Sequence, residues 1–457
     1  MKRHLIIISG FFLMLISAHA IAQDVDREAM EITLYANGFG IVHDKREIEL
    51  ERGITEINIA GIPRDIRPET VNGKFDGRIL DQNFSFQESH WPEAIYKQLK
   101  GEHIILISEG GHLVEGRLHS YKHGQIWLED EDGSFVFIPN THSYRLQTGL
   151  DPEVLTLESG LNWTVETENS GMHDVSIYYQ VNNIRWSADY NMMISENEES
   201  MTLEAKATIN NHSGMDYPEA RVRLVAGDIN ILRQDHPQYR GAMGGPEMMM
   251  QDSDISPQEL GDYYVFELPE RILISDQAQR QVTLRRAEDV QVKKHYKYQT
   301  GSMGQVRRNN NAVTAEYRMA NTEEFKLGTP LPAGLVKVYK KAGELMELIG
   351  EDRLDHTAVG QDFTIEVGGV FDIDIEEKQI RLDNLSNRVW EEDREIHITN
   401  QKDQEVMIEV ELQLQQNEEL RSSSIEPREI EARRYIFEVS VGAESKIILS
   451  FQLRRSN

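Results

Sequence analysis

The sequence contains no cysteine, and this absence excludes a disulfide-bonded scaffold, zinc–thiolate sites and cysteine nucleophiles at once. A chain of 457 residues, 39% of them hydrophobic, must then be stabilised by apolar cores large enough to need no covalent cross-links. That length predicts about two to four domains.

The chain also lacks the short motifs of common catalytic sites. It has no GxSxG elbow, no HExxH pair, no phosphate-binding glycine loop and no serine–lysine pair of familiar spacing. Ser422, Ser423 and Ser424 lie in an expected loop with no base nearby in the sequence. We therefore expect a non-enzymatic protein without a cofactor. A hydrolase that acts on envelope glycan or peptide stays open as an alternative, because 77 acidic residues supply many carboxylate pairs and only geometry selects one.

Long apolar runs are scarce, and the one clear example lies at the N-terminus. Lys2 and Arg3 precede an apolar stretch over Leu5–Ile16, and small residues follow it at Ala20 and Ala22. This order is typical of a secretory signal peptide, with cleavage after either alanine. The run is shorter than the roughly 20 residues that a membrane span needs. We expect export across the inner membrane, a periplasmic location with possible envelope association, and no transmembrane span after signal cleavage.

Acidic residues dominate the charge. The formal net charge is −29, and loss of Lys2 and Arg3 with the signal lowers it to −31. Such a surface repels nucleic acid and anionic lipid headgroups and favours solubility. We expect partners to be proteins or envelope polymers rather than nucleic acid, and the charge leaves the oligomeric state open.

Alternation with a period of two is the main structural signal. In Val406–Gln415, VMIEVELQLQ, the aliphatic residues fall on one parity and the polar residues fall mainly on the other. Side chains of a strand alternate between its two faces, so the pattern predicts a strand with one buried and one solvated face. We expect Glu409, Glu411 and Gln413 to lie in water, and binding to occur at sheet edges and loops.

The same pattern recurs along the chain and predicts an all-β, multidomain fold of antiparallel β-sandwiches with very little helix. Breaks in it suggest the following division: a signal peptide over 1–22, an N-terminal β region over 23–90, a small barrel over 91–150, a central β-sandwich over 151–300 with a flexible loop at 232–260, a further β region over 301–393 with a basic loop at 301–311, and an immunoglobulin-like C-terminal domain over 394–457.

The stretch Trp91–Leu150 differs from its surroundings. Trp91–Lys100 carries Pro92 and helical spacing, which predicts one short helix. Five short strands follow, separated by tight turns that include Asp132-Gly133. This order predicts an inserted closed barrel of the Sm or SH3 kind.

Four segments together resemble a known family: Leu34–Leu50 (LYANGFGIVHDKREIEL), Asn182–Ile194 (NNIRWSADYNMMI), Leu327–Tyr339 (LGTPLPAGLVKVY) and Ile349–Gly368 (IGEDRLDHTAVGQDFTIEVG). They are similar to the mucoidy inhibitor A-like proteins, bacterial envelope proteins that share domain of unknown function 4139. The better-known members carry a coiled coil ahead of the shared domain, and here the barrel occupies that place. The resemblance implies an envelope β-protein and carries no catalytic residue across.

Two of these segments have physical roles that follow from their residues. Trp186 and Tyr190 are large aromatics near the start of a strand, and we expect them to seal a sandwich core. Pro330 and Pro332 cannot donate to a β-ladder, so Pro330–Gly334 is expected at a sheet edge or crossover. That corner and the methionine-rich loop are candidate contact sites.

Met243, Met248, Met249 and Met250 form a thioether cluster in the 232–260 loop, with His236 nearby. Soft sulfur ligands suit Cu(I), so periplasmic copper binding is a second alternative function. Methionine-rich tracts also serve as adaptable hydrophobic contacts. We favour a linker or partner contact and assign no metal ligand.

His119 and His123 lie in the predicted barrel with His112, and a turn between them could bring two imidazoles onto zinc, with Asp130 or Glu131 as a further ligand. Histidines on hairpins are more often solvated. We keep them as weak candidates for a zinc site.

Asp372, Asp374 and Glu376 alternate on one predicted strand, beside Glu377. Carboxylates at this spacing stand about 7 Å apart, too far to share one ion without further ligands. Calcium needs six or more oxygens, so a solvated sheet face is the better interpretation.

Overall fold

The computed structural model describes residues 27–85, 95–96, 99–130, 132–149, 159–227, 257–304, 313–343, 345–431 and 433–456. Almost every regular element in these ranges is a strand, which confirms the predicted all-β class. A single 3₁₀ turn covers Pro68–Thr70, and no helix in the described ranges is long and apolar enough to cross a membrane. The predicted signal peptide lies outside the described residues.

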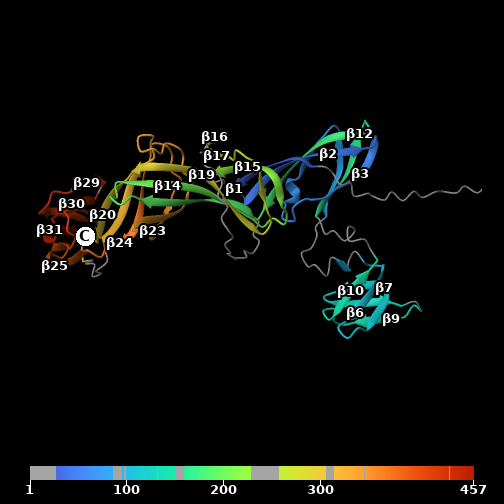
Figure 1. Ribbon diagram of the computed structural model, residues 1–457. Helices are drawn as coiled ribbons and strands as arrows, with labels where there is room; N and C mark the ends of the chain where they lie inside the picture. Colours follow the sequence, from blue (N-terminus) through green and yellow to red (C-terminus); the bar gives the residue numbers. More distant parts are fainter. Residues whose placement is uncertain are drawn as a thin grey trace, which may run out of the picture.

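An eight-stranded sheet and a three-stranded sheet form the N-terminal part (Figure 1). Alternate residues of β2 (Phe39–Leu50) are buried from Val42 to Leu50. In the eight-stranded sheet it lies between β1 and β12, with the other strands as follows: β16 (Gln258–Leu260), β17 (Tyr263–Glu267), β15 (Tyr217–Ala226) with β18 (Ile272–Ile274) also paired to it, β1 (Arg27–Tyr35), β2, β12 (Gly171–Asn182) and β4 (Asn72–Lys74). The three-stranded sheet runs β3 (Gly53–Ile59), β11 (Gly160–Thr167) and β5 (Arg78–Ser85).

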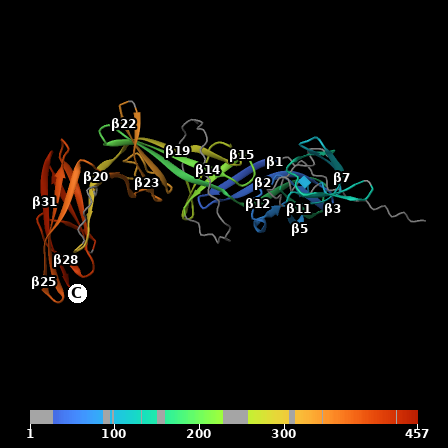
Figure 2. The ribbon, with the colours of Figure 1, turned by 90° about the horizontal axis from the view of Figure 1, so that it is seen from below.

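A five-stranded sheet continues the same apolar core (Figure 2). Trp186 and Tyr190 are 2% and 1% exposed in it, as predicted. The Pro330–Gly334 corner leads into a strand that pairs in parallel with the strand of Trp186, and a Cβ on Gly334 would lie 2.2 Å from the Ala188 carbonyl oxygen. The strand order is β19 (Ala278–Gln291), β14 (Ser200–Asn211), β13 (Ile184–Ile194), β22 (Gly334–Ala342) and β23 (Leu345–Leu354).

The C-terminal part is a sandwich with its own core, built from a six-stranded and a four-stranded sheet. It is larger than the predicted domain over 394–457, because strands from 293–386 complete both sheets. The six-stranded sheet runs β24 (Asp362–Gly369), β21 (Val313–Ala320), β20 (Lys293–Thr300), β27 (Val406–Gln413), β30 (Arg434–Val441) and β29 (Arg428–Glu431). The four-stranded sheet runs β25 (Ile373–Ser386), β26 (Val389–Asn400), β31 (Ser445–Ser456) and β28 (Glu418–Ser423), so Ser422 and Ser423 lie in a strand and not in the expected loop.

Other predicted boundaries also fall inside sheets. The eight-stranded sheet joins residues on both sides of 150, and the five-stranded sheet joins residues on both sides of 300. Each case involves a parallel pairing between strands far apart in the chain: β1 with β15, and β13 with β22. Side-chain alternation marks a strand but carries no information about its partner, so these pairings leave no local signal.

The predicted inserted module comprises β6 (His103–Ser108), β7 (Leu113–Lys122), β8 (Gln125–Glu129), β9 (Phe135–Ile138) and β10 (Tyr144–Thr148). The chain leaves the three-stranded sheet at Ser85 and returns at Gly160, and the Ser85 hydroxyl donates to the Gly160 carbonyl at 3.0 Å. The module is therefore an insertion between two paired strands, with its own small core.

The module is an open sheet, not the closed barrel that we predicted. Its order is β10-β6-β7-β8-β9, and β9 and β10 are not paired with each other. Of the predicted helix over Trp91–Lys100, the structure describes Ile95 and Tyr96 as helical. Tyr96 and Leu99 pack into the module core.

The two predicted loops are only partly described. Residues 232–256 lie outside the described ranges, and Gln258–Leu260, at the end of the predicted loop, forms strand β16 instead. Residues 301–304 are irregular as predicted, and 305–311 lie outside the description.

Candidate functional site

Charged groups are buried in the C-terminal sandwich, but they serve structure. Arg394 and Glu392 are both fully buried and paired at 2.7 Å. Arg394 also donates to the Thr300 hydroxyl at 3.1 Å and to the carbonyl oxygens of Gly301 and Ser302 at 2.7 and 2.9 Å. Every donor of the guanidinium side chain therefore goes to Glu392 or to the segment that follows β20, which leaves none for a ligand.

A second ion pair, Glu418 with Arg455, holds the same segment. Glu418 is 3% exposed, and its carboxylate accepts from Arg455 at 2.6 Å and from the Met303 backbone N–H at 3.2 Å. Arg455 in turn donates to the Met303 carbonyl at 2.9 Å. The two pairs hold residues 300–304 against the four-stranded sheet.

The N-terminal core holds a comparable group. Asp44 and Arg46 replace aliphatic residues in the buried row of β2, and Arg27 joins them from β1. Arg46 donates to the Ala60 carbonyl at 2.6 Å, and Arg27 donates to the Gly61 carbonyl at 2.8 Å. These ions fix the chain after β3, so they also act as structural clamps.

The polar face of β27 is only partly the solvated face that we predicted, because Gln413 is exposed but Glu411 is half-buried and Glu409 is buried. Val406, Ile408, Val410 and Leu412 are buried as expected, but Glu409 is only 7% exposed. Arg318 of β21 binds it through both terminal nitrogens, and Lys297 and Arg434 pair with Glu411 at 2.9 and 2.8 Å. The neighbouring strands thus bring cations that cover this face.

These contacts shift the titration of the carboxylates. Hydrogen bonds from Arg318 lower the pKa of Glu409, against an opposing effect of burial. Burial raises the pKa of Glu411, but Arg434 and Lys297 outweigh it, so this pKa is also lowered. The pKa of His295 is lowered by burial and by the nearby charge of Arg318. Both carboxylates therefore stay ionised and paired at neutral pH, which does not suit a general acid.

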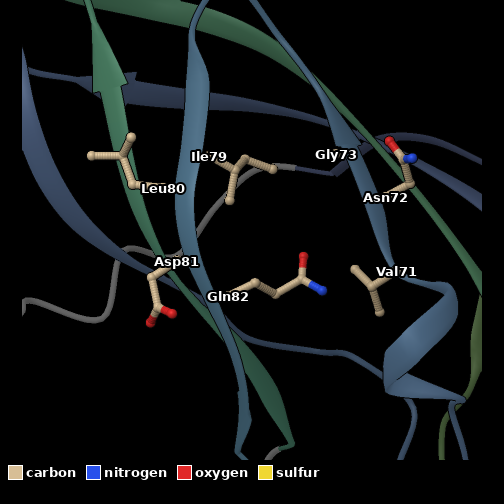
Figure 3. A pocket seen from close by; sticks show the side chains of 7 residues that line it. All are labelled: Val71, Asn72, Gly73, Ile79, Leu80, Asp81 and Gln82. Carbon is tan, nitrogen blue, oxygen red and sulfur yellow. The ribbon is translucent and has the colours of Figure 1, made fainter.

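One hollow lies between β4 and β5, which belong to two different sheets (Figure 3). Its volume is about 350 Å³, and Val71, Ile79 and Gln82 extend into it in Figure 3. Gly73 closes its inner end because Trp163 lies directly behind, 2.3 Å from where a Cβ would be. Asp81 is the only ionisable side chain among the described residues of its lining, and these residues offer no pair of carboxylates for hydrolysis.

A second hollow of about 470 Å³ lies where β20 and β27 end, beside residues 300–302. Within the part of the chain that the structure describes, Glu411 is its only ionisable lining residue, and it is already paired with Lys297 and Arg434. Neither hollow contains a nucleophile next to a base.

The structure describes only some of the residues that we considered for metals. Met243 and Met248–Met250 lie outside the described residues, as does Glu131. His119 is on β7 and packs edge-to-face against Phe135, and His123 sits in the following turn with φ 50°. Among the residues that the structure describes, no three His, Asp or Glu side chains are arranged to hold a metal ion.

In the acidic stretch 372–376, Asp372 and Glu376 are exposed, which agrees with the predicted solvated face, and each forms an ion pair. Asp372 pairs with Lys402 at 3.0 Å, and Glu376 pairs with Lys378 at 2.9 Å. Glu377 is buried and accepts a hydrogen bond from the Tyr298 hydroxyl at 2.6 Å.

One exposed surface stands out, on the inserted module. We call it the aromatic face and define it as His119, Trp127, Phe135 and Phe137. Trp127 and Phe137 are each 43% exposed and Phe135 is 50% exposed. The rings of Trp127 and Phe137 are 4.7 Å apart, and those of His119 and Phe135 are 5.2 Å apart.

The strand register explains why these rings meet. Ile126 and Leu128 of β8 point into the module core, so Trp127 between them points outward. It lies directly opposite Phe137 of β9, and Glu129 lies opposite Phe135. The turn that joins the two strands has Gly133 at φ 81°, a conformation that favours glycine.

Sequence reasoning missed the aromatic face, although a signal was present. In Gln125–Glu129, QIWLE, the tryptophan shares its parity with glutamine and glutamate. A large aromatic residue on the solvent-facing side of a strand is a candidate contact residue. In Phe135–Ile138 the same signal cannot be read, because the residues on both faces of this strand are apolar and the sequence does not show which face is exposed.

Comparison with known proteins adds a family without an activity. A family described as "Domain of unknown function (DUF4139)" matches residues 175–453, well over half of the chain. No curated protein matches the sequence.

Proposed function

We propose that this chain, which belongs to the DUF4139 family, is an exported cell-envelope protein that acts by binding rather than by catalysis. Within the family we place it near the mucoidy inhibitor A-like proteins, on the segments Asn182–Ile194 and Leu327–Tyr339. Its contact surface is the aromatic face of the inserted module.

The observation that carries this proposal is the exposure of three aromatic rings on one side of a small sheet. Tyrosine, tryptophan and phenylalanine are enriched where proteins contact partners, and contiguous exposed apolar patches mark interaction sites. The module has a separate core and is inserted between β5 and β11, so it presents this surface without disturbing the sheets that hold it.

Export is supported by the charge, apolar stretch and small residues of the first 22 residues. Cell fractionation tests it. We expect a periplasmic product shortened at Ala20 or Ala22, and retention of the full-length chain in the cytoplasm when two charged residues replace apolar ones within Leu5–Ile16. A cytoplasmic, unprocessed wild-type chain would contradict the proposal.

Contact through the aromatic face is tested by photo-crosslinking in cells. Gln125 is exposed and shares the outward parity of Trp127, so a photoreactive phenylalanine at Gln125 leaves the face intact. We expect adducts from Gln125, a large loss of them when Trp127→Ala is added, and none from the same probe at Phe371, which is 87% exposed on the C-terminal sandwich. Equal yields at both positions would refute the proposed surface.

A further inference from the structure

The aromatic face lies at an unpaired edge. β9 is the last strand of the module sheet, and β8 is its single neighbour among the described residues. Most edge strands carry a charge, a bulge or a proline that hinders the addition of another strand. β9 reads Phe-Val-Phe-Ile, contains none of these, and pairs with β8 without a register shift.

The hydrogen-bond pattern shows which backbone groups are free. The backbone N–H of Asp130 donates to the Ser134 carbonyl at 2.8 Å, which makes these two residues a hydrogen-bonded pair. Hydrogen-bonded and non-hydrogen-bonded pairs alternate along an antiparallel ladder. The next pair, Glu129 and Phe135, is therefore non-hydrogen-bonded, and so is the pair of Trp127 and Phe137.

It follows that the backbone N–H and C=O groups of Phe135 and Phe137 point away from β8. The same two residues carry the exposed rings. Pro139, the next residue with this orientation, has no N–H, so the free edge ends there. The module thus offers two donors and two acceptors in strand geometry beside an aromatic surface.

We infer that the partner of the aromatic face contributes an extended polypeptide segment, which adds to β9 as a sixth strand. This inference rests on the proposed function and names the chemical class of the partner. A polypeptide backbone presents donors and acceptors at the spacing of such an edge, whereas an aromatic surface alone would suit a sugar chain equally well. Side chains of the added strand that share the parity of Phe137 lie against the rings.

Charge restricts the segment further. The chain carries a net charge of −29. Glu129 lies opposite Phe135, the first residue of β9, and Asp130 lies opposite Ser134 just before it. A neutral or basic segment is favoured, and pairing with a second, equally acidic copy is opposed.

Defined peptides test the inference on the full-length chain. The probe is a capped heptapeptide of alternating lysine and valine. Its controls are the glutamate–valine analogue and a lysine–valine peptide N-methylated on one edge, which keeps the charge but cannot pair. We expect the first peptide to bind at least tenfold more tightly than either control at physiological salt.

Hydrogen exchange locates the contact. We expect binding to slow exchange at the amides of Phe135 and Phe137 at least tenfold, with little change at Val136, whose amide already pairs with β8. Equal binding of the N-methylated peptide, or protection confined to another sheet edge such as β3, would overturn the inference.

Three variants distinguish the contribution of the Phe137 ring to binding from that of its backbone N–H. Phe137→Ala removes a ring and keeps the N–H, and we expect about tenfold weaker binding. Phe137→Pro also removes the N–H without breaking a bond to β8, and we expect no detectable binding while Val136 stays protected. Phe371→Ala is the matched control and leaves affinity unchanged. A proline variant that binds like the alanine variant would exclude strand addition.

The outcomes also distinguish this inference from the proposed function. If chitotetraose binds with a dependence on Trp127 and no peptide does, the surface is a glycan site, and only the strand inference fails. If protection of Phe135 and Phe137 instead rises with protein concentration, the edge serves self-association. If no probe binds and crosslinking from Gln125 is also negative, both proposals fail.

Discussion

Neutralising Glu392 gives the sharpest test of how the C-terminal sandwich is stabilised. Glu392→Gln keeps the side-chain shape but leaves the fully buried Arg394 without a counter-ion. Glu392 also accepts from the Gly304 backbone N–H at 2.7 Å, so that bond weakens as well.

The expected cost is large because the charge cannot reach water. Removing one partner of a buried ion pair costs about 3–5 kcal/mol. A domain is commonly stable by about 5–15 kcal/mol, so the loss is a major fraction of the stability of this sandwich. Residues 300–304 keep their contacts with Arg394, Glu418 and Arg455, but the anchor at Gly304 is weakened.

Native-state hydrogen exchange measures this effect locally, which matters because the chain has separate cores and unfolds in more than one step. Amides of β26 and β31 should exchange with an opening free energy lowered by about 3 kcal/mol or more, while those of β2 and β12 stay unchanged. Asp393→Asn is the matched control, because Asp393 is adjacent and its partner Arg381 lies at the surface. We expect little change from it.

The double variant Glu392→Leu with Arg394→Met completes the test. It buries no charge, so it should be more stable than Glu392→Gln alone despite carrying two substitutions. Our interpretation is refuted if Glu392→Gln costs less than about 1 kcal/mol, or if the double variant is the less stable of the two.

Three further predictions follow from contacts in the other sheets. Hydrogen bonds from Arg318 lower the pKa of Glu409, so the ionised Glu409 stabilises the fold fully above pH 4.5, its ordinary pKa, and this stabilisation is lost as the pH falls below that value. Acid titration of the unfolding of the C-terminal sandwich should show this loss of stability, and Glu409→Gln should make the loss smaller. Gly334→Ala should destabilise the β13–β22 pairing by about 1–3 kcal/mol in urea unfolding, because its Cβ would overlap the Ala188 carbonyl, whereas Gly149→Ala, in open space, should be neutral. Asn321→Leu should lower thermal stability and raise exchange near 357–358, because the Asn321 amide donates to the carbonyls of Thr329, Thr357 and Ala358.

Sequence periodicity was sufficient for strands and for their buried faces. Val406–Gln415 predicted β27 and its apolar row because burial alone sets that alternation. It did not predict that Glu409 would be covered, since the cation that covers it, Arg318, lies on a strand 91 residues away in the sequence. A charged residue on the polar face of a strand is exposed to solvent only if no neighbouring strand places an opposite charge against it.

The same reasoning explains why the sequence predicted the strands of the inserted module correctly but wrongly predicted that they close into a barrel. Short strands between tight turns identified the five strands and their order along the chain, because each pairing in the meander β6 to β9 is local. Closure depends on whether β9 meets β10, and neither strand carries a local mark of that contact. In the structure this contact is not made, so an apolar edge that would be internal in a closed barrel is exposed beside Trp127. The exposed rings and the free backbone groups of Phe135 and Phe137 therefore have one structural origin, which is why we test them together.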